Sequence, residues 1–216
     1  MGQILDRLEK TIPDSQTATA LSHQSPFELL VATILSAQCT DGRVNQVTPG
    51  LFRVYQSVAD FAKADGQHLE KCVQSINFYR NKTKAIIGSA KMMMNLFGGV
   101  VPKTMEELIT LPGIGRKTAN VILGHAFGIP SIVVDTHVRR VANRLQLTQS
   151  DDPDQIEFDL MPLMPKSKWT SGSSRLLLHG RHVCRARAPL CLACHLFDLC
   201  PAKNEKRAAK NRAGQL

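Results

Sequence analysis

Apolar residues recur every three or four positions along most of this chain, and the alternation typical of strands is nearly absent. This spacing predicts helices that each bury one face, and therefore an all-α fold. Ser25-Pro26, the capping box Thr104-x-x-Glu107 and Asp135 mark helix starts. The expected helices cover residues 27–37, a segment from 40 that Pro49 and Gly50 disturb, 57–64, 67–76, 79–97, 104–111, 116–127, 135–145, a segment from 153, and 169–179; residues 131–134 are expected to be extended.

The composition is that of a folded, basic protein. Hydrophobic residues make up 43% of the 216 positions, enough for one large domain or two small ones. The 27 Lys and Arg residues outnumber the 18 Asp and Glu residues, which gives a formal charge of +9. This excess favours a polyanionic partner such as nucleic acid or an anionic membrane surface, although a basic protein without such a partner has the same signature.

No segment has the apolar length of a membrane span, and residues 1–10 carry acids among their apolar side chains. The sequence therefore predicts a soluble, intracellular protein of the cytoplasm that does not bind membranes. We also expect a monomer. The basic tail from Lys203 is expected to be a solvated end with, at most, weak phosphate contacts.

Four of the six cysteines lie close together in the sequence: Cys184, Cys191, Cys194 and Cys200. The spacing C-x6-C-x2-C-x5-C predicts a metal centre, because loops of this length allow four thiolates to surround one soft cation or cluster. Both an iron–sulfur cluster and zinc fit four thiolates, and His195 as a substitute ligand is unnecessary beside a complete set. In a reducing compartment, Cys39 and Cys72 are expected to be small core residues.

A short segment, Leu111-Pro112-Gly113-Ile114-Gly115, connects two expected helices and is followed directly by Arg116 and Lys117. Its two glycines permit a tight turn and leave backbone N–H groups unshielded by side chains. With the positive end of the next helix dipole, these amides would bind a phosphate oxygen of DNA, whatever the base sequence. The alternative is an ordinary turn between helices.

Lys117 and Asp135 are the candidate catalytic residues. At the start of a helix, the dipole and the charge of Arg116 oppose protonation of the Lys117 amine, which makes it a candidate nucleophile that forms a Schiff base with a sugar carbon. Asp135 is expected to accept backbone N–H bonds at a helix start, and its charge would stabilise a deoxyribose cation. The alternatives are a phosphate-contacting lysine and a simple helix cap.

Several motifs follow one another in a specific order. They are Ile34-Leu35-Ser36-Ala37-Gln38, Thr40-Asp41, the hairpin segment 111–121, Val134-Asp135-Thr136-His137-Val138, Leu178-His179-Gly180-Arg181 and the four cysteines. In this order and spacing, the chain resembles the endonuclease III family of base-excision DNA glycosylases, which belongs to the helix-hairpin-helix superfamily. The resemblance spans nearly the whole sequence.

The resemblance implies two α-helical domains with the active site between them. Residues 20–130 would form a six-helix barrel that carries the hairpin, and residues 1–19 with 131–216 would form an iron–sulfur cluster domain. The four cysteines would hold a 4Fe-4S cluster of structural role. The loop after Cys184 would present Arg185 and Arg187 to the phosphates of double-stranded DNA.

The resemblance also implies the reaction. The enzyme would remove oxidised or damaged pyrimidines and then nick the strand at the abasic site by β-elimination. Lys117 would attack C1′ of the extruded nucleotide while Asp135 assists departure of the base. Gln38 and Phe78 match the residues that fill the gap in the duplex, and the alternatives are a buried core glutamine and an ordinary core phenylalanine.

The chain departs from the family pattern at three places. Asn77-Phe78-Tyr79 replaces Gly-Leu/Phe-Tyr, Gly42-Arg43 follows Thr40-Asp41, and Pro49 interrupts a helix. These differences bear on lesion preference and on the geometry of the wedge. Lys117 argues against an adenine glycosylase, which lacks the lysine, and against a mismatch thymine glycosylase, which usually has tyrosine there. A DNA-binding module without chemistry would not need both Lys117 and Asp135.

Overall fold

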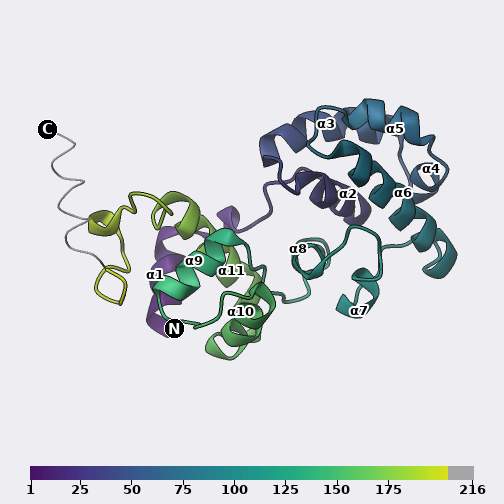
Figure 1. Ribbon diagram of the computed structural model, residues 1–216. Helices are drawn as coiled ribbons and strands as arrows, with labels where there is room; N and C mark the ends of the chain where they lie inside the picture. Colours follow the sequence, from purple (N-terminus) through teal and green to yellow (C-terminus); the bar gives the residue numbers. More distant parts are fainter. Residues whose placement is uncertain (204–216) are drawn as a thin grey trace, which may run out of the picture. The chain divides into compact units, whose positions relative to one another are not determined.

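The computed structural model describes residues 1–203, which form eleven α-helices, short 3-10 turns and no β-strand. The predicted all-α fold is confirmed. The chain divides into two compact units, shown in Figure 1. We call Thr19–Ile129 the central unit, and Met1–Ala18 together with the chain from Pro130 onward the terminal unit.

Seven α-helices belong to the central unit (Figure 1): α2 Pro26–Ser36, α3 Asp41–Val54, α4 Val58–Ala62, α5 Gly66–Val73, α6 Tyr79–Leu96, α7 Met105–Leu108 and α8 Arg116–Ala126. Their core is built around α2, in which residues 29–32 and 35 are fully buried. Helices α3, α6 and α8 all contact α2. Burial on nearly every side explains why α2 is almost uniformly apolar in sequence.

Local capping sets the starts of several helices. The hydroxyl of Ser25 accepts a hydrogen bond from the amide of Glu28 at 3.1 Å, so the predicted start of α2 is confirmed. Thr104 caps α7 in the same way through the amide of Glu107. The Glu107 carboxylate accepts from the Thr104 hydroxyl at 2.8 Å, where a complete capping box would use the Thr104 backbone amide.

Two features of the helices differ from the prediction. Pro49 does not disturb α3, which continues to Val54; the proline is exposed, so water can replace the missing helical hydrogen bond. The helix α1, Gly2–Thr11, was not predicted. Its apolar stripe of Ile4, Leu5 and Leu8 is short and lies among charged residues, but all three side chains are buried.

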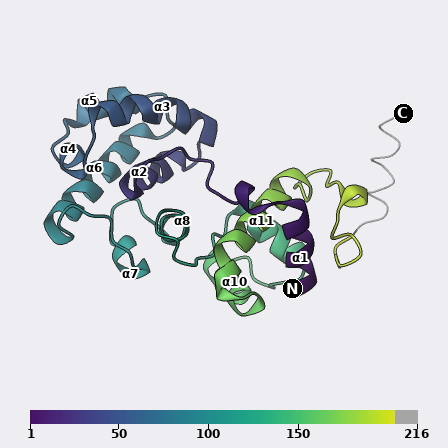
Figure 2. The same cartoon turned by 180° about the vertical axis from the view of Figure 1, so that it is seen from behind.

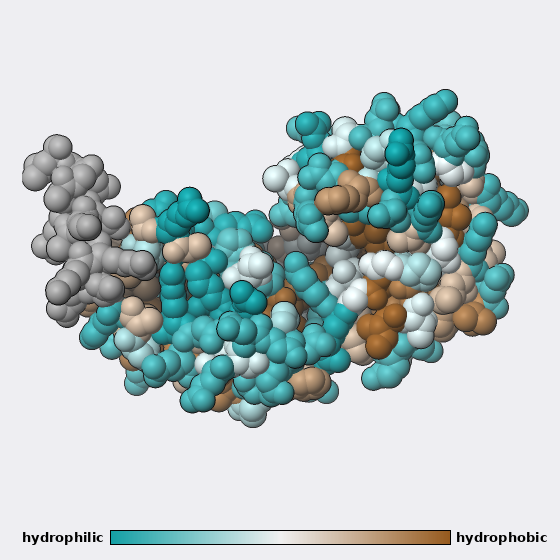
Figure 3. Space-filling view, in the orientation of Figure 1, coloured by the Kyte–Doolittle hydropathy of each residue, from teal (hydrophilic) through white to brown (hydrophobic). Residues whose placement is uncertain are grey.

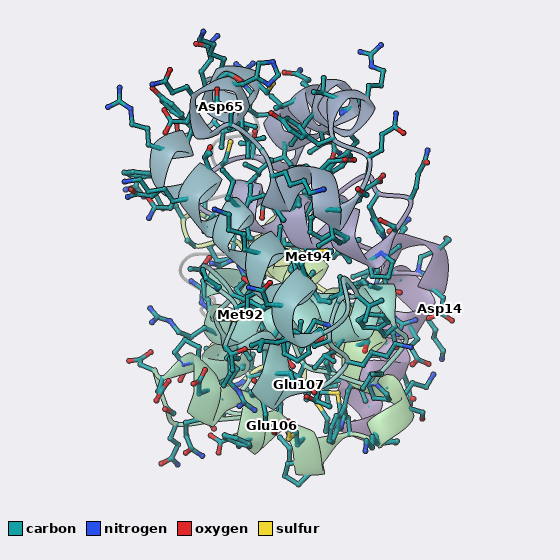
Figure 4. All side chains as sticks on the ribbon, turned by 90° about the vertical axis from the view of Figure 1, so that its right-hand side faces the viewer. Asp14, Asp65, Met92, Met94, Glu106 and Glu107 are labelled. Atoms are coloured by element: carbon teal, nitrogen blue, oxygen red, sulfur yellow. The ribbon has the colours of Figure 1, made fainter. Side chains whose placement is uncertain are left out.

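Helix α6 carries a run of three methionines near its C-terminal end, and Figure 4 labels Met92 and Met94 of this run together with Glu106 and Glu107 of α7. Met93 is fully buried, whereas Met94 is 41% exposed. The sulfur of Met92 accepts a hydrogen bond from the hydroxyl of Thr110 at 3.8 Å. The run therefore joins the core of α6 to the segment that follows α7.

The terminal unit contains α1, α9 Thr136–Arg144, α10 Pro153–Leu160 and α11 Trp169–His182. Helices α1, α10 and α11 group together in both Figure 1 and Figure 2. Helices α9 and α11 pack closely, because Gly180 has no side chain at their contact. A Cβ atom on Gly180 would lie 3.0 Å from the Cβ of His137 and 3.0 Å from a methyl group of Val141.

Buried and surface arginines bind the N-terminal helix to the rest of the terminal unit. Arg175 of α11 is 2% exposed; it donates to the carbonyl of Ile12 at 3.0 Å and to the carboxylate of Asp14, labelled in Figure 4, at 2.6 Å. Arg7 of α1 forms an ion pair with Asp198. These contacts stabilise the N-terminal segment through residues far away in the chain, so the sequence of α1 alone does not reveal them.

The visible surface is mostly polar. Figure 3 shows hydrophilic residues over most of the terminal unit, and separate hydrophobic patches on the central unit. Exposed apolar residues of the central unit include Phe78, Leu96 and Val100. Within residues 1–203, no helix combines the length and the hydropathy that a bilayer crossing requires.

The close contact at Gly180 gives a first test. Gly180→Ala should lower the free energy of unfolding by about 1–3 kcal/mol, because the added methyl overpacks the contact with His137 and Val141. Gly50→Ala in α3 is the matched control, since a Cβ there meets nothing within 4 Å, and it should be neutral or stabilising by up to about 1 kcal/mol. Urea unfolding followed by circular dichroism measures both, and equal effects would contradict the packing argument.

Candidate functional site

The hairpin between α7 and α8 is anchored on the core of the central unit. Leu111 and Ile114 are 2% and 5% exposed and belong to that core. The hydroxyl of Ser89 in α6 donates to the carbonyl of Pro112 at 2.7 Å. Leu111 was expected to contact DNA, but its side chain points into the core; it holds the hairpin in place, and a DNA contact could come only from its backbone.

The two glycines of the hairpin have different physical roles. Gly113 has φ 79°, and a Cβ atom there would lie 2.7 Å from the Cβ of Ala85 in α6, so the fold itself requires glycine. Gly115 has φ −95°, and a Cβ atom there would meet nothing within 4 Å. The fold places no steric demand on Gly115, which leaves close approach of a ligand as a reason for glycine at this position.

Lys117 lies in the first turn of α8 and is exposed, while Arg116 beside it is half-buried. The N-cap residue of α8 is Gly115, so no N-cap side chain covers the first turn. The amide end of this helix and the lysine amine are therefore both accessible to a ligand from solvent. This arrangement suits an anion that lies across the helix N-terminus.

Asp135 caps α9 as predicted. Its Oδ1 atom accepts hydrogen bonds from the amides of His137 at 2.9 Å and Val138 at 2.8 Å. Both bonds end on the same oxygen, so Oδ2 takes part in neither. The preceding residues 131–134 form no helix or strand and are buried. The carboxylate is thus fixed in orientation by the helix start.

Gln38 and Phe78 are both exposed, in loops at the ends of α2 and α6. Phe78 is 62% exposed and is the N-cap residue of α6. The alternatives of a buried core glutamine and a core phenylalanine are therefore wrong. Both residues have a left-handed backbone, with φ 54° for Gln38 and 56° for Phe78. The side chain of Asn77 joins their loops by donating to the carbonyl of Gln38 at 2.8 Å.

The four clustered cysteines line one small cavity of about 50 Å³ in the terminal unit. Its wall also contains Val141, Leu145, Leu196 and Phe197. Within residues 1–203, no three Cys, His, Asp or Glu side chains are arranged to hold a single metal ion. The cysteines thus surround a shared space without converging on one point. Cys39 and Cys72 instead pack against the core of the central unit, as expected.

Burial shifts the pKa values of Cys194, Cys200 and the neighbouring His179. It raises the pKa of the Cys194 thiol to about 11, with smaller contributions from the neighbouring cysteines, and it also raises the pKa of Cys200. Burial lowers the pKa of His179 to about 4, helped by His195. The His179 ring is therefore neutral near pH 7, and its Nε2 lies 3.7 Å from the sulfur of Cys194. Thiols of this kind become thiolates when they gain a metal partner.

Arg140 and Arg144 of α9 were not identified from the sequence, although they join Asp135's helix to the cysteine segment. Arg140 donates to the carbonyls of Gly180 at 2.7 Å and Cys184 at 3.0 Å. Arg144 donates to the sulfur of Cys184 at 3.3 Å and to the carbonyl of Arg185 at 2.8 Å. In the sequence the two arginines are spaced one helical turn apart, on the face of the helix toward the core, and this spacing could have indicated a shared structural role.

Arg185 and Arg187 are exposed in the loop between Cys184 and Cys191. Arg185 donates to the carbonyl of Ala188 at 3.2 Å, and Ala188 has a left-handed backbone with φ 46°. With Arg144 bound to the carbonyls of this loop, its backbone is held from inside while its two arginines remain at the surface. The terminal unit therefore contains Asp135, the cysteines and these arginines, and the central unit contains Gln38, Phe78, the hairpin and Lys117.

Comparison with known proteins supplies the family. The model described as HhH-GPD superfamily base excision DNA repair protein matches residues 31–166. An endonuclease III from Synechocystis sp. is 51% identical over 201 residues, which cover 93% of this chain and 91% of the relative. An endonuclease III from Bacillus subtilis is 43% identical over 207 residues, which cover 95% and 93%.

A solved structure described as a trapped endonuclease III–DNA covalent intermediate is similar over 98% of both chains, with a TM-score of 0.87 and 42% identity. The similarity thus includes both units, the hairpin and the cysteine segment. The chain belongs to the HhH-GPD superfamily of base excision DNA repair proteins, and within it to the endonuclease III family of DNA glycosylases with AP lyase activity.

Proposed function

We propose that this protein removes oxidised pyrimidines from double-stranded DNA and cleaves the strand 3′ to the resulting abasic site, with Lys117 as nucleophile and Asp135 as its carboxylate partner. The observation that carries the proposal is the exposed amine of Lys117 in the first turn of α8, directly after a hairpin whose Gly115 leaves room for a ligand. The similarity to an endonuclease III that was trapped covalently on DNA supports it.

The DNA backbone would bind at the start of α8. A phosphate oxygen there gains from the helix dipole, from backbone N–H groups near Gly115 and from the positive charge of Arg116. Arg185 and Arg187 would add a second set of phosphate contacts, in keeping with the formal charge of +9. These contacts position the duplex and read no base sequence.

In the proposed chemistry, the amine of Lys117 takes part both in removal of the base and in cleavage of the strand. The Lys117 amine attacks C1′ and its nitrogen gives up a proton, while the bond from C1′ to the base breaks and the base leaves with the bonding electrons and gains a proton. The ionised Asp135 carboxylate stabilises the positive charge that develops on the sugar. Ring opening then gives a Schiff base, loss of a C2′ proton breaks the C3′–O bond, and water finally releases Lys117.

The cysteine cavity fits a cluster better than a single ion. Four soft thiolate donors line one space, and within residues 1–203 no three donors converge on a point, as a tetrahedral zinc site would require. We therefore assign Cys184, Cys191, Cys194 and Cys200 as ligands of a 4Fe-4S cluster. When bound, the cluster supplies covalent cross-links within the segment that presents Arg185 and Arg187.

The domain assignment follows from the same proposal. The central unit would be the six-helix barrel domain with the helix-hairpin-helix, and the terminal unit would be the cluster domain. We propose that the protein acts as a monomer in the cytoplasm on duplex DNA that contains damaged pyrimidines or abasic sites.

The nucleophile can be tested by trapping. Wild-type protein incubated with a duplex that contains thymine glycol, and then treated with borohydride, should form a covalent adduct visible by electrophoresis. Lys117→Ala should form none, because no amine is left to make the imine. An undiminished adduct with Lys117→Ala would exclude this lysine as the nucleophile.

Asp135 is tested by measuring the rate of base excision and the affinity for DNA separately. Asp135→Asn should slow excision of thymine glycol by about 100-fold or more, since it removes a charge that stabilises the transition state. The amide oxygen can still accept the capping bonds at Oδ1, so folding and DNA binding should be largely kept. Loss of DNA binding in parallel with activity would instead mean that Asp135 is a cap alone.

Alanine substitutions at the two hairpin glycines distinguish an effect on DNA binding from an effect on stability. Gly115→Ala should cost at most about 1 kcal/mol of stability, because alanine is a poorer N-cap residue than glycine. It should weaken binding of abasic-site DNA by about tenfold, or about 1.4 kcal/mol, because the methyl group occupies the path of the phosphate. Gly113→Ala should lower the free energy of unfolding by about 1–3 kcal/mol, because of its positive φ and its contact with Ala85. If Gly115→Ala binds DNA as well as wild type, the phosphate does not lie at this amide.

The metal centre is tested by colour and metal content. Protein purified without oxygen should be brown, with broad visible absorbance, and should contain iron and sulfide. Cys191→Ser should lose most of this iron, whereas Cys39→Ser and Cys72→Ser, the matched controls outside the cavity, should keep it. A colourless protein that contains zinc would overturn the cluster assignment.

A further inference from the structure

Two loops of the central unit each hold one exposed residue in an unfavourable backbone conformation. Gln38 follows α2 with φ 54°, and Phe78 precedes α6 with φ 56°. Residues other than glycine seldom adopt a left-handed backbone, so surrounding contacts must maintain both conformations. The exposed side chains of Gln38 and Phe78 do not supply those contacts themselves.

Asn77 and Lys82 supply them. The side-chain amide of Asn77 donates to the carbonyl of Gln38 at 2.8 Å. The ammonium group of Lys82 donates to the carbonyls of Leu35 at 2.9 Å and Ala37 at 2.6 Å. These carbonyls belong to the C-terminal end of α2, where the helix provides no partners. Three hydrogen bonds thus join the end of α2 to the start of α6.

Lys82 holds both loops at once. Its backbone amide donates to the carbonyl of Phe78 at 3.2 Å, while its ammonium group holds the residues just before Gln38. Its side chain is buried, with 7% of the residue exposed, and this burial lowers the pKa of the ammonium group. A buried cation bonded to two carbonyls has little freedom to move, so the base of both loops is rigid.

Asn77 lies in a different environment. It is exposed on the same surface as Gln38 and Phe78, and its amide reaches the carbonyl of Gln38 itself. The link between the two loop tips is therefore a single bond from an exposed side chain, separate from the buried bonds of Lys82.

We propose that Asn77 is a positioning residue that holds Gln38 and Phe78 at a fixed separation, as a rigid pair that enters the duplex when the damaged nucleotide is extruded. The proposal rests on the function proposed above, which gives Gln38 and Phe78 their role in the gap. Rigid loops lose less conformational entropy on entering DNA, so the bond favours the extruded state. The chemistry at Lys117 does not depend on it.

The test separates extrusion from chemistry. Asn77→Ala should slow single-turnover excision of thymine glycol from duplex DNA by about three- to tenfold, the range expected for one lost hydrogen bond. Cleavage of an abasic site in single-stranded DNA should keep its wild-type rate, because no base pair has to open. Asn81→Ala, the same substitution at an exposed position of α6, is the matched control and should change neither rate.

A double-mutant cycle tests whether Asn77 acts through Gln38. Asn77→Ala should have little further effect in a Gln38→Ala background, because the tip that it positions has lost its side chain. Additive effects of the two substitutions, or an equal loss on duplex and single-stranded substrates, would overturn the positioning role. If wild-type protein cleaves neither substrate, the proposed function fails; if it cleaves both and Asn77→Ala matches it, this inference alone fails.

Discussion

The deep burial of α2 is the constraint on which the central unit depends. A helix with apolar residues on nearly every face is stable in water only when other helices surround it, and α3, α6 and α8 do so here. Burial also shields the Leu35 carbonyl near the end of α2 from water, and a polar group has to reach it. Lys82 meets that need, and in doing so it fixes the loop that carries Gln38.

A second set of polar contacts organises the terminal unit. Arg140 and Arg144 extend from α9 to backbone carbonyls around Cys184, so the helix that Asp135 begins and the cysteine segment form one body. Gly180 lets α11 approach α9 closely enough for these bonds. The orientation of the Asp135 carboxylate and that of the cysteine segment are therefore linked through the guanidinium groups of α9.

The features that could be predicted from the sequence depend on interactions between residues that are close together in the chain. The caps at Ser25, Thr104 and Asp135 are visible in a few neighbouring residues, and the spacing of the cysteines predicts their gathering around one cavity. Helix α1 was missed because the partners of its Arg7 and Glu9, which are Asp198 and Arg175, lie more than 150 positions away. The bonds from Asn77 and Lys82 to backbone carbonyls leave no sequence pattern, since every residue offers a carbonyl.

Those distant partners have a consequence for how the protein is made. Arg7 contacts Asp198 across 191 positions, so at about 5–20 residues per second a ribosome needs roughly 10–40 s to deliver the second residue after the first. The central unit emerges in between and can fold meanwhile. During that interval the apolar stripe of α1, with Leu5 and Leu8, has no core to enter. The nascent chain should therefore expose an amphipathic segment with unburied apolar side chains, which chaperones can bind until synthesis is nearly complete.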